Sequence, residues 1–254
     1  MKIVSVFSRK GGVGKTTTAA NLAAALATNG GRVLAVDADS QGHLALALGV
    51  ERVPLFSEWA TGGDLLSLDV SGPWAATGAI ISERFGAVAL VAGGNESLGL
   101  ELDAAAVRHL ASRLRADAAR LGAEWVIIDS PAVGPLQDFA VAASDYAILP
   151  APCHFLGASG AVDARALVQK ISADVRVLAL PTMYERREKD ARHWLNVLGL
   201  HFSDLLTAVP HRVAVAESLA VGLPVVLFKP GNPAAVAYMA AADGLRAACM
   251  LEVA

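Results

Sequence analysis

Residues 8–18 read Ser8-Arg9-Lys10-Gly11-Gly12-Val13-Gly14-Lys15-Thr16-Thr17-Thr18. This segment follows the apolar run 3–7 and leads into a run rich in alanine and leucine at 19–26, whose composition favours helix. Glycines let backbone N–H groups converge on phosphate oxygens, and the N-terminus of the following helix adds partial positive charge. Strand, glycine-rich loop and helix in this order predict a phosphate-binding loop for a nucleoside triphosphate.

The loop contains a backbone cradle and two lysines. The residues expected to surround the nucleotide are Gly11, Gly12, Val13, Gly14 and Thr17. Lys15 is expected to reach the β- and γ-phosphates, and the Thr16 hydroxyl is expected to bind Mg²⁺. The usual pattern, G-x-x-x-x-G-K-[ST], would need glycine at position 9, but this chain has Arg9 and then a second lysine, Lys10. The alternative to a functional role for Lys10 is that it is a solvated lysine of the loop.

Two further segments place aspartates at the ends of predicted strands. Residues 33–42 read VLAVDADSQG, in which Asp37 and Asp39 project the same way because side chains alternate along a strand. The apolar residues 125–128 precede Asp129, which has the Walker B form and is expected to hold Mg²⁺ directly or through water. Strand carboxyl ends face the ligand crevice in a doubly wound sheet, so these carboxylates are expected beside the phosphate loop. The alternative to a role at the phosphate loop is that Asp37 and Asp39 cap the next helix.

Strand-like and helix-like segments alternate along the chain. Strands are predicted at 2–7, 32–37, 87–92, 124–129, 145–150, 174–181 and 206–209, and helices at 16–28, 101–121, 135–143, 157–172, 188–199 and 233–249. This rhythm predicts an α/β fold, a doubly wound and mostly parallel sheet flanked by helices, in a single domain spanning 1–254. Residues 50–85 are the least regular, and we expect helices and loops inserted after the second strand.

The composition indicates a sizeable core and no overall attraction for nucleic acid. Hydrophobic residues make up 54% and charged residues 18% of the chain, which argues against broad disorder. The formal net charge is −3, so DNA contact would need a local basic patch. Cys153 and Cys249 form no CxxC motif, which argues against a zinc or cluster site. The chain starts on its first strand and has no apolar stretch of about 20 residues, so neither a signal peptide nor a spanning helix is expected.

The segment KGGVGKT at 10–16 resembles the deviant Walker A motif of the ParA/MinD superfamily. Residues 37–43 are similar to the DxDPQGN segment of that family, with Ser40 in place of proline and His43 in place of asparagine. Residues 145–150, 182–187 and 209–225 resemble its ADxVLIP, TMYDxR and IPRNVRLSEAPSxGKPV segments. The resemblance therefore covers nearly the whole chain.

This resemblance implies roles for individual residues, with ATP and Mg²⁺ as the cofactors. Lys10 would cross a dimer interface and touch the nucleotide of the partner, as an arginine finger does in trans. Asp39 would position the attacking water and Asp37 would support the metal shell, which makes Lys10, Lys15 and Asp39 the catalytic set. Met183 and Pro210 fall where the family lines its adenine pocket.

The resemblance further implies a ParA-like ATPase without an N-terminal helix-turn-helix. ATP would close a homodimer, the dimer would bind DNA non-specifically, and a ParB-like activator would stimulate hydrolysis, so that a plasmid or chromosome is partitioned. The expected location is the cytoplasm, on the nucleoid when ATP is bound. No membrane contact is expected, because residues 247–254 carry no Lys or Arg. The candidate DNA-binding residues are Arg186, Arg187, Lys189, Arg192 and Arg212.

Other readings of the same residues stay open. Glu185, Glu188 and Asp190 interleave with the basic candidates, and a helix that carries both signs is usually a solvated face. A MinD-like or orphan positioning ATPase for a protein cargo or a membrane site is a second function. A nucleotide-gated binding module with negligible turnover is a third. Phosphate release with and without DNA, and flotation with liposomes, would separate them.

Overall fold

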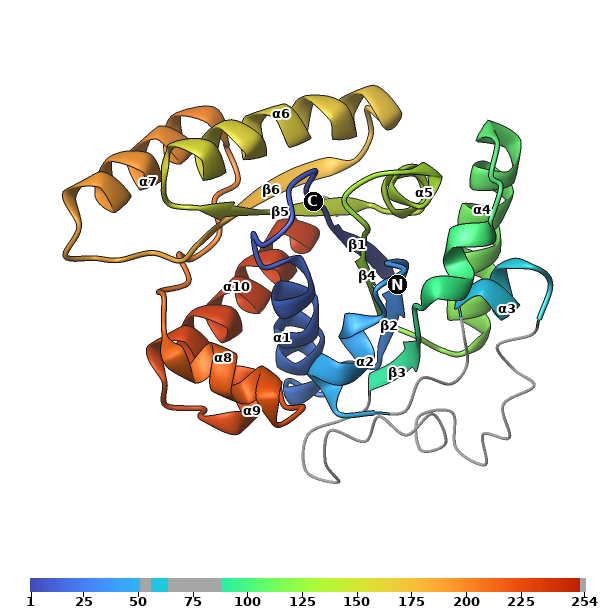
Figure 1. The fold of residues 1–254 in the computed structure, drawn as a ribbon, viewed down its shortest axis with the longest axis horizontal. Coiled ribbons are helices and arrows are strands. Elements are labelled where there is room, and N and C mark those ends of the chain that lie inside the picture. Colours follow the sequence, from blue (N-terminus) through green and yellow to red (C-terminus); the bar gives the residue numbers. More distant parts are fainter. Residues whose placement is uncertain (51–55, 64–87, 252–254) are drawn as a thin grey trace.

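A computed structural model describes residues 1–50, 56–63 and 88–251, and its centre is one parallel sheet. The strands are β1 (Lys2–Val6), β2 (Val33–Asp37), β3 (Val88–Val91), β4 (Trp125–Asp129), β5 (Tyr146–Pro152) and β6 (Arg176–Thr182). Their order is β3-β2-β4-β1-β5-β6, so β1 lies in the middle between β4 and β5 (Figure 1). Parallel neighbours need crossover connections, which the helices supply. The predicted α/β class is confirmed.

Helices cover both faces of this sheet (Figure 1). They are α1 (Lys15–Thr28), α2 (His43–Leu48), α3 (Phe56–Ala60), α4 (Ala104–Arg120), α5 (Pro135–Ala142), α6 (Phe155–Ile171), α7 (Lys189–His201), α8 (Val213–Ala220), α9 (Val225–Phe228) and α10 (Pro233–Met250), with a 3-10 turn, η1, at Asn95–Gly99. Helices α1, α2 and α8–α10 share a core with one face, whereas α3–α7 pack on the other. Within the described ranges, none of the helices combines the length and the apolar character needed to cross a bilayer.

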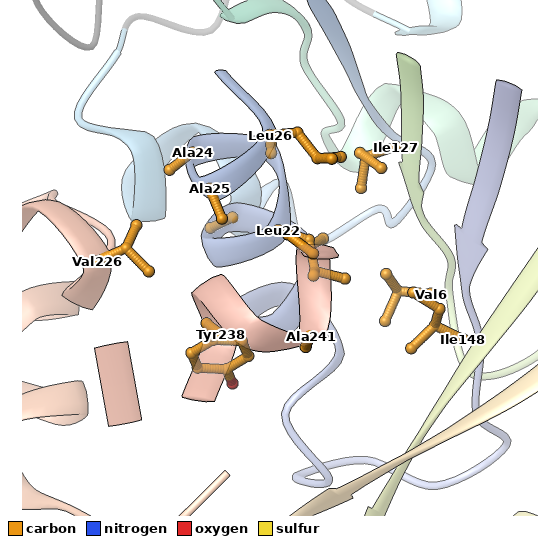
Figure 2. Packing of buried hydrophobic residues seen from close by; sticks show 14 of the residues in the cluster. Val6, Leu22, Ala24, Ala25, Leu26, Ile127, Ile148, Val226, Tyr238 and Ala241 are labelled. Atoms are coloured by element: carbon orange, nitrogen blue, oxygen red, sulfur yellow. The ribbon is translucent and has the colours of Figure 1, made fainter. Parts of the chain in front are cut away.

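Helix α1 is the central helix of the first face. Its Leu22 and Leu26 lie over Val6, Ile127 and Ile148 of the three central strands, and all five side chains are fully buried (Figure 2). Helix α10 packs along another side of α1 (Figures 1 and 2). Because α1 begins directly after the glycine-rich loop, this packing fixes the position of the loop at the carboxyl end of β1.

The prediction of a strand at 206–209 is wrong. Two isolated bridges flank this segment: Leu205 pairs with Ala179 of β6, and Pro210 pairs with Tyr184, which follows β6. The N–H of Val209 donates to the carbonyl of Pro181 at 2.8 Å, but Pro181 has no N–H to donate in return, so a continuous ladder is interrupted there. The other six predicted strands are present, with ends that differ by at most two residues.

The short helices were not all anticipated. Helices α2, α8 and α9 form where no helix was predicted. Within the irregular stretch 50–85, residues 56–60 are helical as expected, whereas 51–55 and 64–85 lie outside the described residues.

Two glycines bring α2 and the end of α8 into direct backbone contact. Gly49 and Gly222 both have left-handed backbone angles, with φ of 66° and 69°. A Cβ atom on Gly49 would lie 2.4 Å from the carbonyl oxygen of Gly222, and a Cβ atom on Gly222 would lie 2.9 Å from Cα of Gly49. Neither position has room for a side chain, so the contact requires glycine on both sides.

Candidate functional site

The glycine-rich loop forms the expected turn between β1 and α1. Gly12 and Gly14 have left-handed φ angles of 72° and 93°, which glycine adopts without the steric cost that other residues meet. Helix α1 begins at Lys15. Its N-cap residue is Gly14, which has no side chain that could accept from the first N–H groups of the helix. The first N–H groups of α1 therefore point at the loop, where an anion can accept from them.

The two lysines of the loop lie in different surroundings. Lys15 is 9% exposed, and its Nζ donates to the carbonyl of Lys10 at 3.3 Å, so it lies folded over the loop. Nζ of Lys10 donates to the carbonyl of Leu156 in the first turn of α6 at 2.6 Å. A Cβ atom on Gly160 would lie 2.9 Å from the end of the Lys10 side chain. Lys10 thus lies against α6 of its own chain, and a role across a dimer stays a prediction.

Asp37 and Asp39 follow β2 as predicted, and backbone donors hold both. Asp37 is fully buried and accepts from the N–H groups of Leu44 and Asp39, each at 3.0 Å. Asp39 is partly exposed and accepts from the N–H of Gln41 at 3.1 Å. The bond from Leu44 shows that Asp37 accepts from the first turn of α2, as the capping alternative describes, and a role of Asp37 in a metal shell stays a prediction.

Asp129 is the buried carboxylate with unmet bonding capacity. It is 1% exposed and stands in register with Asp37 on β2 and with Val6 on β1. Neither carboxylate oxygen makes a regular hydrogen bond within the described parts of the chain. Burial and then the charge of Asp37 raise the pKa of Asp129 well above its ordinary value, while the nearby Thr16 hydroxyl and Lys15 act in the opposite direction.

These surroundings fit Mg²⁺. A buried carboxylate without regular hydrogen bonds, beside a threonine hydroxyl, offers the hard oxygen ligands that this ion prefers. In the described ranges, no three His, Cys, Asp or Glu side chains are grouped so that they could hold a metal ion themselves. Mg²⁺ that relies on phosphate oxygens and water for its remaining ligands is consistent with this arrangement.

One functional position was missed by the sequence analysis. A Cβ atom on Gly93, just after β3, would lie 2.3 Å from the carbonyl oxygen of Asp39 and 2.8 Å from Oδ1 of Asp37. Glycine is therefore required where this strand end approaches the carboxylates. The glycine pair at 93–94, directly after a predicted strand, is the signal that could have indicated this close approach.

A pocket of about 200 Å³ adjoins the loop and contains both predicted adenine-pocket residues. We call it the base pocket; its lining residues are Val13, Gly14, Thr17, Thr182, Met183, Val209, Pro210, His211, Arg212, Val215, Ala216, Leu219 and Tyr238. Met183 has a left-handed φ of 52°, and such strain in a residue other than glycine is concentrated at ligand sites. Met183 and Pro210 thus lie together beside the loop, and contact with adenine stays a prediction.

The candidate DNA-binding residues divide into two groups. Arg186 and Arg187 lie in the exposed turn after β6, and Lys189 and Arg192 lie in the first part of α7. We call these four residues the basic turn. Arg192 donates to the carbonyl of Arg186 at 3.1 Å, which holds the two parts together. Arg212, the fifth candidate, lines the base pocket instead.

The glycine-rich loop, the buried Asp129 beside Thr16 and the parallel sheet define a P-loop ATPase of the deviant Walker A class. A family model described as AAA domain matches residues 1–177. The chain is 31% identical over 247 residues to the sporulation initiation inhibitor protein Soj of Bacillus subtilis, covering 94% of this chain and 95% of Soj. The chain belongs to this family and to the ParA/MinD superfamily.

One further relative supports this membership, and one solved structure supports the fold. The chromosome partitioning protein ParA of Caulobacter vibrioides is 28% identical over 252 residues, covering 94% of this chain and 91% of that protein. The septum site-determining protein MinD of Pyrococcus horikoshii, solved with Mg-ADP, has a TM-score of 0.78 at 24% identity and covers 98% of each chain. The similarity to MinD establishes the fold.

Proposed function

We propose that this chain binds ATP with Mg²⁺ and hydrolyses it to ADP and phosphate, and that ATP controls formation of a homodimer. The observation that carries this proposal is the combination of Asp129, buried and without regular hydrogen bonds, with Lys15 and Thr16 at one end of the sheet. An isolated buried carboxylate is costly, so its presence points to a ligand that completes it. The similarity to Soj and to the chromosome partitioning protein ParA supports the same proposal.

The residues of the site would share the work of hydrolysis. Lys15 would turn from the Lys10 carbonyl toward the β- and γ-phosphates, and the N–H groups at the start of α1 would bind phosphate oxygens. Thr16 and Asp129 would hold Mg²⁺, which when bound neutralises charge on the phosphates. Asp39 is partly exposed, which suits a group that must orient water.

The output of the cycle would be reversible DNA binding by the dimer. The basic turn is exposed, and phosphate contacts need only positive charge on an accessible surface. A ParB-like activator would stimulate hydrolysis and release the dimer, so that a plasmid or chromosome is partitioned on the nucleoid in the cytoplasm. This part rests on the relatives and on the basic turn, which Glu188 and Asp190 interrupt.

Phosphate release and ATP binding, measured for the wild type and for Lys15→Ala, test the proposal. We expect the wild type to bind ATP and to release phosphate faster when DNA is present. Lys15→Ala removes the cation next to the cradle and should abolish ATP binding in isothermal titration. Near-normal ATP affinity in this variant would contradict the assigned site. ATP-dependent dimerisation without measurable phosphate release would favour the nucleotide-gated binding module.

A further inference from the structure

The base pocket contains a guanidinium that the nucleotide site does not yet explain. Val13, Val209, Pro210, Val215 and Leu219 give the pocket largely aliphatic walls. Burial raises the pKa of the Tyr238 hydroxyl to about 12, so this group is neutral at physiological pH. Arg212 is therefore the one permanently positive side chain among the described residues that line the pocket.

Hydrogen bonds hold the segment that carries Arg212 in place. The N–H of Tyr184 donates to the carbonyl of Val209 at 3.0 Å, and the N–H of His211 donates to the carbonyl of Tyr184 at 3.1 Å. Nδ1 of His211 lies 3.2 Å from Oε1 of Glu185, which adds a side-chain link between the same two segments. Arg212 thus follows backbone that is fixed to the segment just after β6.

The guanidinium itself is only partly engaged. Nη1 of Arg212 donates to the carbonyl of His211 at 2.6 Å, which is its one hydrogen bond within the described residues. A planar cation held by one nitrogen beside an aliphatic slot can lay its flat face on an aromatic ring, and arginine does this more readily than lysine. A purine base that enters the slot would offer such a ring.

We infer that Arg212 contacts the bound nucleotide, with its guanidinium packed on the purine ring at the mouth of the base pocket, and that it is not part of the DNA surface. The inference rests on the proposed function, because it requires a nucleotide whose phosphates occupy the glycine-rich loop. It changes the assignment of Arg212 from partner binding to recognition of the base.

The test compares ligands with and without a base. Isothermal titration would measure the affinities of ATP, ADP and inorganic tripolyphosphate for the wild type, Arg212→Ala and Arg108→Ala. The last variant removes an equal charge from an exposed position on α4. A cation–π contact of this kind predicts that Arg212→Ala weakens ATP and ADP by about three- to tenfold. Tripolyphosphate affinity should be unchanged in all three proteins.

DNA binding provides the second readout. With ATP at saturating concentration, Arg212→Ala should bind random duplex as the wild type does. Unchanged ATP affinity in this variant, or an equal loss of tripolyphosphate affinity, would overturn the inference, since the effect would then not involve the base. Weaker DNA binding with normal ATP affinity would return Arg212 to the DNA surface. A wild type that fails to bind ATP would overturn the proposed function and this inference together.

Discussion

Asp39 and Asp129 are both carboxylates at strand ends, yet their surroundings suit them to different work. Asp129 is buried and lacks regular hydrogen bonds within the described ranges, as expected of a carboxylate that binds a cation. Asp39 is partly exposed and its Oδ1 accepts a single backbone bond, from Gln41. A substitution at either position should therefore affect a different measurable property.

Asp39→Ala should separate ATP binding from turnover. The variant keeps Lys15, Thr16 and Asp129, so ATP affinity should remain close to that of the wild type. Phosphate release should fall by about 10²–10⁴-fold, which is the usual contribution of a group that activates water. Rapid quench measurement of a single turnover checks this, and a wild-type rate would show that another group positions the water.

Asp129→Asn should stabilise the protein in the absence of nucleotide and Mg²⁺. Replacing the buried carboxylate, which lacks regular hydrogen bonds, by a neutral amide should raise the free energy of unfolding at pH 8 by about 1–3 kcal/mol. Because the pKa of Asp129 is raised in the folded state, its ionisation weakens the fold as pH rises, and the advantage of the variant should shrink toward acidic pH. Thermal melting across a pH series measures this.

Asp204→Asn is the matched control, for which we expect the opposite change in the free energy of unfolding. Asp204 accepts from Arg176 at 2.7 and 3.1 Å, and this pairing lowers its pKa. The stabilisation from this pair is present above the ordinary pKa of aspartate and is lost as pH falls. Asp204→Asn should therefore lower the free energy of unfolding by roughly 0.5–1 kcal/mol at neutral pH. A destabilised Asp129→Asn without ligands would contradict our view of Asp129.

At the scale of elements, the contact between Gly49 and Gly222 links the helix that follows the carboxylates to the helix that follows the base pocket. Helix α2 follows the segment of Asp37 and Asp39, and α8 begins just after Pro210 in the base pocket. Gly49→Ala and Gly222→Ala should each lower the free energy of unfolding by about 2–3 kcal/mol. At either position alanine would have to adopt a left-handed φ, and its Cβ atom would clash with backbone. Gly231→Ala, where a Cβ meets open space, should be nearly neutral in the same denaturant titration. Equal effects at all three positions would contradict the argument.

The six observed strands could be predicted because they are continuous buried runs, and the carboxylates could be predicted because each ends such a run. Short helices could not, since α2, α8 and α9 depend on contacts with α1, α10 and each other more than on their own periodicity. The segment 206–209 looked like a strand, but the missing N–H of Pro181 matters only once β6 lies beside it. The pocket position of Arg212 likewise follows from tertiary contacts.

At the scale of the whole molecule, we expect Lys10 to contact a second copy of this chain. Lys10→Ala should leave ATP binding near normal, because Lys15 and the loop backbone are intact. Phosphate release and ATP-dependent dimerisation should both weaken. Arg9→Ala, which removes a neighbouring exposed charge, is the control. Light scattering with ATP and with ADP measures the dimer, and normal dimerisation and turnover in Lys10→Ala would make Lys10 a surface lysine.

Charge on the surface of the dimer should govern DNA binding through the basic turn. Arg187→Glu should weaken binding to random duplex and reduce the slope of log affinity against log salt by about one unit, without changing sequence preference. Arg108→Glu on α4 is the matched charge reversal. Anisotropy across a salt series measures the slope. An unchanged slope in Arg187→Glu would place the DNA surface elsewhere.

The position of β1 in the sheet sets the order in which a newly made chain can become functional. Strand β1 pairs with β4 and β5, not with β2, which is the next strand in the sequence. The glycine-rich loop follows β1 at once, yet the strand that fixes it has no partner until residues 125–152 have been synthesised. Contacts this distant in sequence form late, because a long loop must close first. A chain that stalls in its first half would therefore carry the complete phosphate-binding motif and still be unable to hold a nucleotide.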